Sequence, residues 1–457
     1  MENFVLDGTR MLIALGVGIV FLMIMILKTK IHTFLALIIT AVFVGIAGGM
    51  PQDMVISAIS SGFGSTLGSI GIIIGFGVMM GQIFEATGAA KTMANTFIKK
   101  LGVNKEEEAL AITGFLVSIP IYCDSGFVIL ASLIKALSKA SKKSIVSLAV
   151  CLAGGLVITH SLVPPTPGPV GAAGIFGANV GLVIIYGMII AVPMLLAVLA
   201  YGKWLGNKIY QIPGEDGEWI RPAGGENLGA VEVKLDEELP SATKSFMPII
   251  VPIILILLST VSKALGVTGQ ASVFFQFFGT PIVAVAIGLL LAIFTLASHM
   301  ERREVIKVME VGIESAGIII LITGAGGALG QVLRDSGVGN HIAEIIKDLN
   351  VPHILLPFII ATIIRFIQGS GTVAMLTAAS ITAPIMASLN VNPVMATLSA
   401  CVGSLFFSYF NDSFFNVVNR TIGIEDPKEQ IRVWSITTTI AWAVGLVALL
   451  ILNMIIG

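Results

Sequence analysis

Charged residues are scarce in this sequence. Asp, Glu, Lys and Arg make up 12% of its 457 residues, about half of the share of about 25% that is usual in a soluble domain. Hydrophobic residues make up 56%, which indicates that lipid surrounds much of the chain. The net charge of −1 provides no excess of positive charge, so we expect no nucleic-acid partner.

Cysteines are few, and nucleotide-binding motifs are missing. Cys123, Cys151 and Cys401 lie far apart in apolar stretches, so we expect them to pack in the core rather than bind metal or form disulfides. The sequence has no Walker-type loop, which argues against ATP-driven transport by this chain alone. The close glycines of GAGGALG at 324–330 lie in an apolar run and are expected to serve helix packing. We expect no enzyme activity, no cofactor and no metal.

Long apolar runs dominate the sequence instead. A stretch of about 20 apolar residues spans a bilayer as a helix. Ten such stretches are predicted, at 10–28, 32–49, 66–84, 145–163, 178–202, 246–265, 273–299, 310–333, 391–411 and 433–456. The first one lacks a basic leader and a small-residue cleavage site, so we expect a spanning helix rather than a cleaved signal peptide.

Two further apolar segments, 109–134 and 353–386, contain polar residues and helix breakers at their middle. The first reads SIPIYCDSG around Pro120, and the second reads RFIQGSGT around Gly369 and Gly371. Irregular backbone is tolerated at membrane depth only where protein or a water-filled cavity satisfies it. These segments are predicted to be re-entrant hairpins, which enter and leave the membrane on the same side.

The positive charges support this topology. With both termini outside and both hairpins returning to their own side, most of the 26 Lys and Arg residues fall in inside loops, as in membrane proteins generally. The Gly-rich, acidic stretch 203–244 is predicted to be a cytoplasmic linker. It would join an N-terminal membrane repeat, 1–202, to a C-terminal membrane repeat, 245–457.

The two halves resemble each other. The segment 81–101 begins GQIFEATG, and 330–350 begins GQVLRDSG. DSGFVIL at 124–130 similarly corresponds to GSGTVAM at 369–375. Each half would contain five crossings and one hairpin, and an odd number of crossings inverts the second half. The expected fold is therefore an all-α polytopic membrane protein with two inverted-topology repeats, a recurring design of secondary transporters.

Polar residues inside these segments are the candidate site. Asp124 is a carboxylate within the membrane, where a charge costs free energy. It therefore either takes part in transport or caps a half-helix. His160 precedes a proline-rich break at 164–169 and either relays protons or serves structure. Arg365 needs an anionic partner, which is either a substrate carboxylate or Asp412. The predicted substrate-binding residues are Tyr122, Asp124, Ser125, Gly126, Thr159, His160, Thr166, Arg365, Gln368, Ser370, Gly371, Thr372, Asn411, Asp412 and Ser413.

Several motifs together resemble the gluconate permease family of gluconate:proton symporters. They are THSLVPPTPGP at 159–169, GAGGALGQVLRDSGVG at 324–339, RFIQGSGTVAM at 365–375, NDSFF at 411–415 and EDPKEQIRVWS at 425–435. The resemblance covers essentially the whole chain. It implies proton-coupled transport of a small hydroxy-carboxylate across the cytoplasmic membrane. The ionisable residues within the membrane segments, Asp124, His160 and Asp412, are the proton-coupling candidates. It also implies kinship with the broader ion-transporter group, whose members are often elevator-type homodimers.

One stretch departs from the family pattern. The family often has an aromatic pair before the hairpin acid and Val-Gly after it, whereas this chain reads Tyr-Cys-Asp-Ser-Gly at 122–126. Smaller and more polar residues there also suit glycerate, 3-hydroxybutyrate or D-serine. A channel or cation/proton exchanger without an organic substrate is a different class, which a fixed cation such as Arg365 disfavours.

Overall fold

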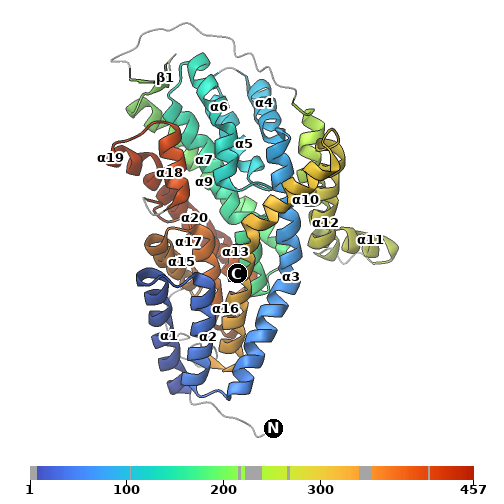
Figure 1. The fold of residues 1–457 in the computed structure, drawn as a ribbon, viewed down its shortest axis with the longest axis vertical. Coiled ribbons are helices and arrows are strands. Elements are labelled where there is room, and N and C mark those ends of the chain that lie inside the picture. The colour runs from blue at the N-terminus through green and yellow to red at the C-terminus, as the bar shows by residue number, and fades with distance from the viewer. Residues whose placement is uncertain are drawn as a thin grey trace.

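The structure, a computed structural model, describes residues 8–102, 104–214, 218–221, 239–264, 268–338, 352–409 and 412–456, and this part of the chain is almost entirely helical (Figure 1). The first half contains α1 (Gly8–Lys28), α2 (Thr33–Gly48), α3 (Gln52–Ala86), α4 (Ala89–Leu101), α5 (Glu106–Val117), α6 (Cys123–Ser141), α7 (Ile145–Leu162), α8 (Pro167–Phe176) and α9 (Val180–Lys208). Two short antiparallel strands follow, β1 (Ile212–Pro213) and β2 (Trp219–Ile220).

The second half begins at α10 (Ala242–Ala264). It continues with α11 (Gln270–Phe278), α12 (Pro281–Leu291), a π-helical turn (Ala292–Leu296), α13 (Arg302–Asp335), α15 (Leu355–Gln368), α16 (Gly371–Ser388), α17 (Pro393–Gly403), α18 (Ser413–Thr421), α19 (Pro427–Gln430), a second π-helical turn (Ile431–Ser435) and α20 (Ile436–Ile456). Helix α9 continues to Lys208 and α10 begins at Ala242, so both helices overlap the ends of the predicted linker at 203–244.

The helices of the described residues include five that are long and apolar enough to cross a membrane, or up to seven if each of two bent pairs is one span. Four shorter apolar helices accompany them. These findings confirm an all-α membrane protein, while the number of ten crossings stays a prediction. Two expected spans are interrupted. The span 273–299 bends by 64°, because Gly279 ends α11 and Pro281, which has no N–H to pair, begins α12.

The other interrupted span is 391–411, where α17 ends at Gly403 and α18 does not begin until Ser413. Elsewhere the breaks lie where the sequence places them. Helix α5 ends before Pro120, α15 ends before Gly369, and α7 ends before the proline-rich segment. These breaks follow from local backbone chemistry. Proline cannot continue a helix, and glycine readily adopts non-helical backbone conformations.

The described elements of the two halves follow the same order. A long helix (α3 or α13) precedes a broken pair (α5–α6 or α15–α16), which precedes a helix with a short helix after it (α7–α8 or α17–α18). A long apolar helix then closes each half, α9 in the first and α20 in the second. The two long helices α3 and α13 pack against each other.

Helix α7 lies at the centre of the protein. All 18 of its residues are buried, and α5 and α9 pack along it. A helix that is apolar on every face is stable only when other helices surround it. By contrast, only 22% of the most apolar stretch within 427–456, which contains α20, is buried. Helix α20 therefore lies at the outside of the protein. The buried position of α7 carries His160, near its C-terminal end, into the interior.

Two glycines allow α5 and α7 to approach closely. A Cβ built on Gly155 of α7 would lie 2.3 Å from the carbonyl oxygen of Ala111, and one built on Gly114 of α5 would lie 2.3 Å from that of Leu152. Both obstacles are backbone atoms, which cannot move aside as a side chain can. The absence of side chains at both positions therefore fixes the distance between the central helix and the first broken pair.

We expect Gly155→Ala to lower the free energy of unfolding by about 1–3 kcal/mol, the usual cost of overpacking. The matched control is Gly64→Ala in α3, because a Cβ at Gly64 would meet nothing within 4 Å. That exposed helical alanine should be neutral or stabilising by up to about 1 kcal/mol. Thermal unfolding of both purified variants in detergent measures the difference, and equal stabilities would contradict the packing argument.

Candidate functional site: a cavity between broken helices

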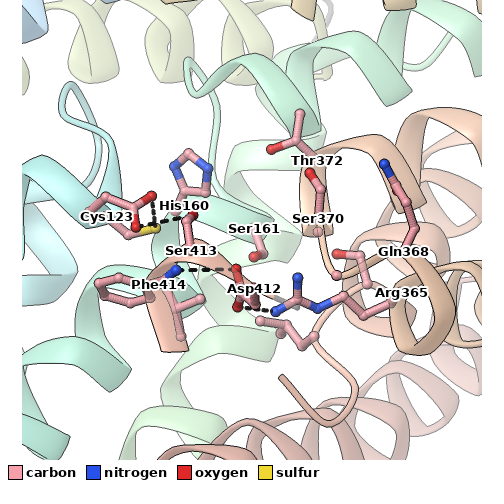
Figure 2. Close-up of a pocket in the computed structure, with 16 residues that line it drawn as sticks. Cys123, His160, Ser161, Arg365, Gln368, Ser370, Thr372, Asp412, Ser413 and Phe414 are labelled. Carbon is pink, nitrogen blue, oxygen red and sulfur yellow. Dashed lines mark hydrogen bonds and ion pairs between the residues drawn. The ribbon is translucent and has the colours of Figure 1, made fainter. Parts of the chain in front are cut away.

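The broken helices meet around a cavity of about 300 Å³. Figure 2 shows Cys123 and Ser413 on one side of this space and Arg365 and Gln368 on the other. The lining residues are Cys123, Asp124, Val157, His160, Ser161, Arg365, Gln368, Gly369, Ser370, Gly371, Thr372, Ser404, Leu405, Asp412, Ser413 and Phe414. They come from both halves of the chain, so the cavity exists only when the halves are assembled.

Three helices begin at the cavity wall. The first residues of α6, α16 and α18 are Cys123, Gly371 and Ser413, and all three line the cavity. A helix N-terminus presents unpaired backbone N–H groups and about half of a positive charge. In the described residues, Tyr122, the N-cap residue of α6, makes no side-chain cap to its first turn. This arrangement favours an anionic ligand.

The second break owes its sharp turn to two adjacent residues. Gly369 ends α15 in the left-handed conformation at φ 90°, which glycine adopts without steric cost. Ser370 then begins the next helix, because its hydroxyl accepts a hydrogen bond from the backbone N–H of Val373 at 3.3 Å. The turn places Ser370, Gly371 and Thr372 at the cavity wall, where Thr372 and Ser370 are seen in Figure 2.

A buried ion pair closes one side of the cavity. Arg365 is only 5% exposed, and its Nη2 lies 2.6 Å from Oδ2 of Asp412. The same oxygen accepts a hydrogen bond from Ser408, while Oδ1 accepts one from the backbone N–H of Phe414 at 3.2 Å. Asp412 is therefore both the partner of Arg365 and the N-cap of α18. Of the two partners expected for Arg365, the structure shows this one.

The guanidinium keeps an unused donor. Nε of Arg365 is buried without a hydrogen-bond partner in the described part of the chain, and so is Oε1 of Gln368 one turn later. A buried polar group without a partner costs about 1–3 kcal/mol. A ligand that accepts a hydrogen bond from Arg365 would recover part of this cost, which makes the α15 end of the cavity a second place for an anion.

Asp124 has far weaker contacts than Asp412. Its Oδ1 is 3.5 Å from the hydroxyl of Ser413, and its Oδ2 is 4.0 Å from the sulfur of Cys123. Among the described residues, no basic side chain lies within ion-pair distance of it. Asp124 is thus the carboxylate of the cavity that lacks a compensating cation.

His160 stands between two spaces. It lines the main cavity and also a small cleft beside it, which Tyr122 and Thr166 line as well. Its ring lies 5.7 Å from that of Tyr122. Nδ1 is buried and has no hydrogen-bond partner within the described ranges. The imidazole therefore has a free nitrogen next to the cavity, at the end of the central helix.

The structure brings together nine of the predicted residues. Those that line the cavity are Asp124, His160, Arg365, Gln368, Ser370, Gly371, Thr372, Asp412 and Ser413. Tyr122 and Thr166 lie at the neighbouring cleft, and Asn411 lies outside the described residues. Ser125, Gly126 and Thr159 do not line the cavity.

Helix geometry explains two of these three exceptions. Successive residues of a helix point about 100° apart, so Asp124 faces the cavity while Gly126 faces α7. A Cβ on Gly126 would lie 2.8 Å from Leu156. Thr159 is fully buried, although its neighbour His160 reaches the cavity. Gly126 and Thr159 therefore occupy packing positions.

Six side chains of the cavity were not among the candidates. They are Cys123, Val157, Ser161, Ser404, Leu405 and Phe414. Helical spacing could have found Val157 and Ser161, which share one face of α7 with His160. Cys151 and Cys401 are fully buried, as expected of packing residues, but Cys123 also contributes to the cavity wall. Ser404 and Leu405 follow the early end of α17, which composition did not reveal.

Comparison with known proteins identifies the family. The model of the GntP family permeases matches residues 10–455. This chain belongs to the GntP permease family. It is 46% identical to an uncharacterized permease of Haemophilus influenzae, over 98% of this chain and 93% of that protein. It is 34% identical to the high-affinity gluconate transporter of Escherichia coli, over 97% of this chain and the whole of that protein.

Two further similarities extend the comparison. The Gnt-II system L-idonate transporter of Escherichia coli is 32% identical to this GntP-family chain, over 97% of it and 99% of that protein. The crystal structure of the YdaH transporter of Alcanivorax borkumensis has a TM-score of 0.60 at 13% identity, covering 88% of this chain and 90% of that one. The latter likeness concerns the fold alone. The GntP-family chain is thus a multi-pass membrane permease and not an enzyme.

The ion pair allows a direct test of its structural role. Arg365→Ala or Asp412→Ala alone leaves an unpaired buried charge, and we expect each to lower the free energy of unfolding by about 3–5 kcal/mol. The double variant removes both charges and should be more stable than either single variant. A double-mutant cycle on purified protein in detergent measures the coupling. Additive losses would show that the pair does not stabilise the fold.

Proposed function

We propose that this GntP-family permease is a proton-coupled symporter that imports a small hydroxy-carboxylate, such as gluconate or a related sugar acid. The balance of charges in the cavity carries the proposal. One guanidinium, that of Arg365, and two carboxylates, those of Asp412 and Asp124, line the cavity. Arg365 and Asp412 offset each other as an ion pair, which leaves the charge of Asp124 uncompensated.

An anionic substrate would be repelled by an ionised Asp124. A like charge nearby disfavours the charged form of a carboxyl group, so a substrate carboxylate and a proton on Asp124 favour each other's binding. Such coupling between two ligands is reciprocal. Entry of the anion together with a proton leaves the net charge of the cavity unchanged, and three helix N-termini stabilise its one negative charge.

The proposed pose follows from the polar groups. The substrate carboxylate lies at the start of α16, near Gly371 and Thr372, within reach of Arg365. The hydroxyl groups of the substrate extend toward Ser161, Ser404 and Gln368, whose side chains line the same space. Names of relatives support this substrate class, since two of them are gluconate and L-idonate transporters. Glycerate, 3-hydroxybutyrate and D-serine are the alternative substrates.

We further propose the transport architecture that the sequence predicts. It consists of two inverted-topology repeats, ten crossings and two re-entrant hairpins, with residues 203–244 as a cytoplasmic linker. The shared order of elements in the two halves supports the repeats. An elevator-type movement and a homodimer complete the proposal by analogy with the broader group of ion transporters. A cation/proton exchanger is the less favoured function, because the relatives are named as transporters of organic anions, gluconate and L-idonate.

We expect purified protein in proteoliposomes to accumulate labelled gluconate when the outside is acidic. The measurement compares gluconate, L-idonate, glycerate, 3-hydroxybutyrate and D-serine, with and without the proton gradient. A protonophore should reduce uptake to equilibration, because the gradient drives accumulation. Uptake that is unaffected by the gradient would contradict proton coupling, and proton movement without uptake of any of these compounds would favour the exchanger.

Asp124→Asn should abolish uphill accumulation and leave exchange of internal for external substrate intact. In wild type, gluconate affinity should weaken as pH rises and Asp124 loses its proton, within the range of about 5–150-fold typical of coupled sites. In Asp124→Asn the affinity should be nearly independent of pH. The matched control is Glu310→Gln on the exposed side of α13.

His160→Gln separates the two proton candidates. If His160 only relays protons to Asp124, this variant should slow uptake and keep the pH dependence of gluconate affinity. Wild-type accumulation and pH dependence in both His160→Gln and Asp124→Asn would place the transported proton elsewhere.

A further inference from the structure

A second cavity differs from the first in being almost entirely apolar. It is an open groove of about 470 Å³ between α4, the end of α5 and the first turns of α10. Its wall is almost wholly apolar and consists of Met93, Thr96, Phe97, Lys100, Leu116, Ala242, Thr243, Phe246, Ile249 and Ile250. Lys100 is its single charged residue.

The two helices that border the groove, α4 and α10, contact each other directly. Phe97 of α4 and Phe246 of α10 meet edge to face, with ring centroids 5.6 Å apart. The hydroxyl of Thr92 donates a hydrogen bond to the carbonyl oxygen of Pro240 at 2.9 Å, which anchors the start of α10 to α4. These contacts hold the two helices at a fixed distance, and the groove is the space left between them.

The groove opens toward the lipid-facing side of α10. Met247 and Ile250 are 37% and 44% exposed, and Ile254 and Leu258 continue the same exposed apolar face along the helix. Helix α10 is one of the helices long and apolar enough to cross a membrane. An acyl chain that lies along α10 would therefore pass directly into the groove.

Lysines accompany the groove on both of its helices, and one of them, Lys100, lines it. Lys100 lies at the C-terminal end of α4, beside Lys99, and Lys244 lies in the first turn of α10. Lys99, Lys100 and Lys244 are exposed. Within the described ranges, Lys100 and Lys244 have no carboxylate at ion-pair distance. The groove is thus apolar apart from Lys100, with an exposed lysine on each of its two helices, which is the complement of an anionic lipid.

We propose that this groove binds an anionic phospholipid, with an acyl chain between Phe97 and Ile250 and the phosphate at Lys100 and Lys244. Basic pockets between membrane helices on the cytoplasmic side are a known mode of anionic lipid recognition. The expected topology places both lysines on the inside. Leu116 joins the lipid to α5, so the bound lipid would contact the first broken helix pair as well as α10.

The test measures binding of fluorescently labelled dioleoyl phosphatidylglycerol to the purified full chain in neutral detergent micelles. Dioleoyl phosphatidylcholine should bind more weakly than phosphatidylglycerol. Lys100→Gln and Lys244→Gln should each lower phosphatidylglycerol affinity about fivefold, the effect that about 1 kcal/mol per cation near a membrane surface produces. The matched control is Lys263→Gln at the opposite end of α10, which should leave the affinity unchanged.

Two further measurements test the contribution of the apolar groove separately from that of the lysines. Thr96→Phe fills the groove and should lower phosphatidylglycerol affinity with all lysines present, and Thr96→Leu is the milder variant if the first does not fold. Inorganic phosphate should not displace the labelled lipid. Equal affinities of wild type and Lys100→Gln/Lys244→Gln, or an equal loss in Lys263→Gln, would overturn the proposal. So would a Thr96→Phe variant that loses self-association and keeps its lipid affinity, because a second copy would then fill the groove.

Discussion

The cavity depends on the ion pair between Arg365 and Asp412. These residues are 47 positions apart in the sequence. Arg365 lies near the end of α15 and Asp412 directly before α18, so their contact joins the second broken pair to α18. Asp412 also caps α18 through the N–H of Phe414. One carboxylate thus satisfies a buried cation and a helix terminus together, and both needs are costly to leave unmet in an apolar environment.

The broken helices leave backbone groups without hydrogen-bond partners, and Asp412 of this ion pair bonds one of them. Each break exposes backbone N–H and C=O groups that a continuous helix would pair internally. In the described residues, Ser370 and Asp412 cap two of the helix starts at the cavity, whereas the start of α6 lacks a side-chain cap. The same asymmetry appears in the carboxylates, since Asp412 is fully engaged and Asp124 is not. Asp412 is therefore engaged in contacts that hold the fold, and Asp124 is the carboxylate to which our proposal assigns the ligand chemistry.

The first broken pair is held from two directions. Gly114 lets α5 lie against the central helix α7, and the α4–α10 contact supports its other side through the groove that Leu116 lines. Buried α7 carries His160 to the cavity, and α5 leads to the break before α6 and Asp124. Small residues pack this pair against protein on one side, and on the other side it borders an open apolar groove, which in our proposal holds a lipid.

Local chemistry determined much of this protein in advance. Proline and glycine placed the breaks near Pro120, Gly369 and the proline-rich segment, and apolar length and family motifs indicated a membrane permease. Nine candidate residues were brought to one cavity because polar side chains inside apolar segments need a shared polar environment.

Tertiary packing decided the rest. It turned Asp124 toward the cavity and Gly126 toward α7, paired Arg365 with Asp412, and brought Phe414 and Ser404 to the wall. It also ended α17 early. A sequence specifies which residues resist lipid or end a helix, but the rotation of each helix and its partners depend on contacts between segments far apart in the chain.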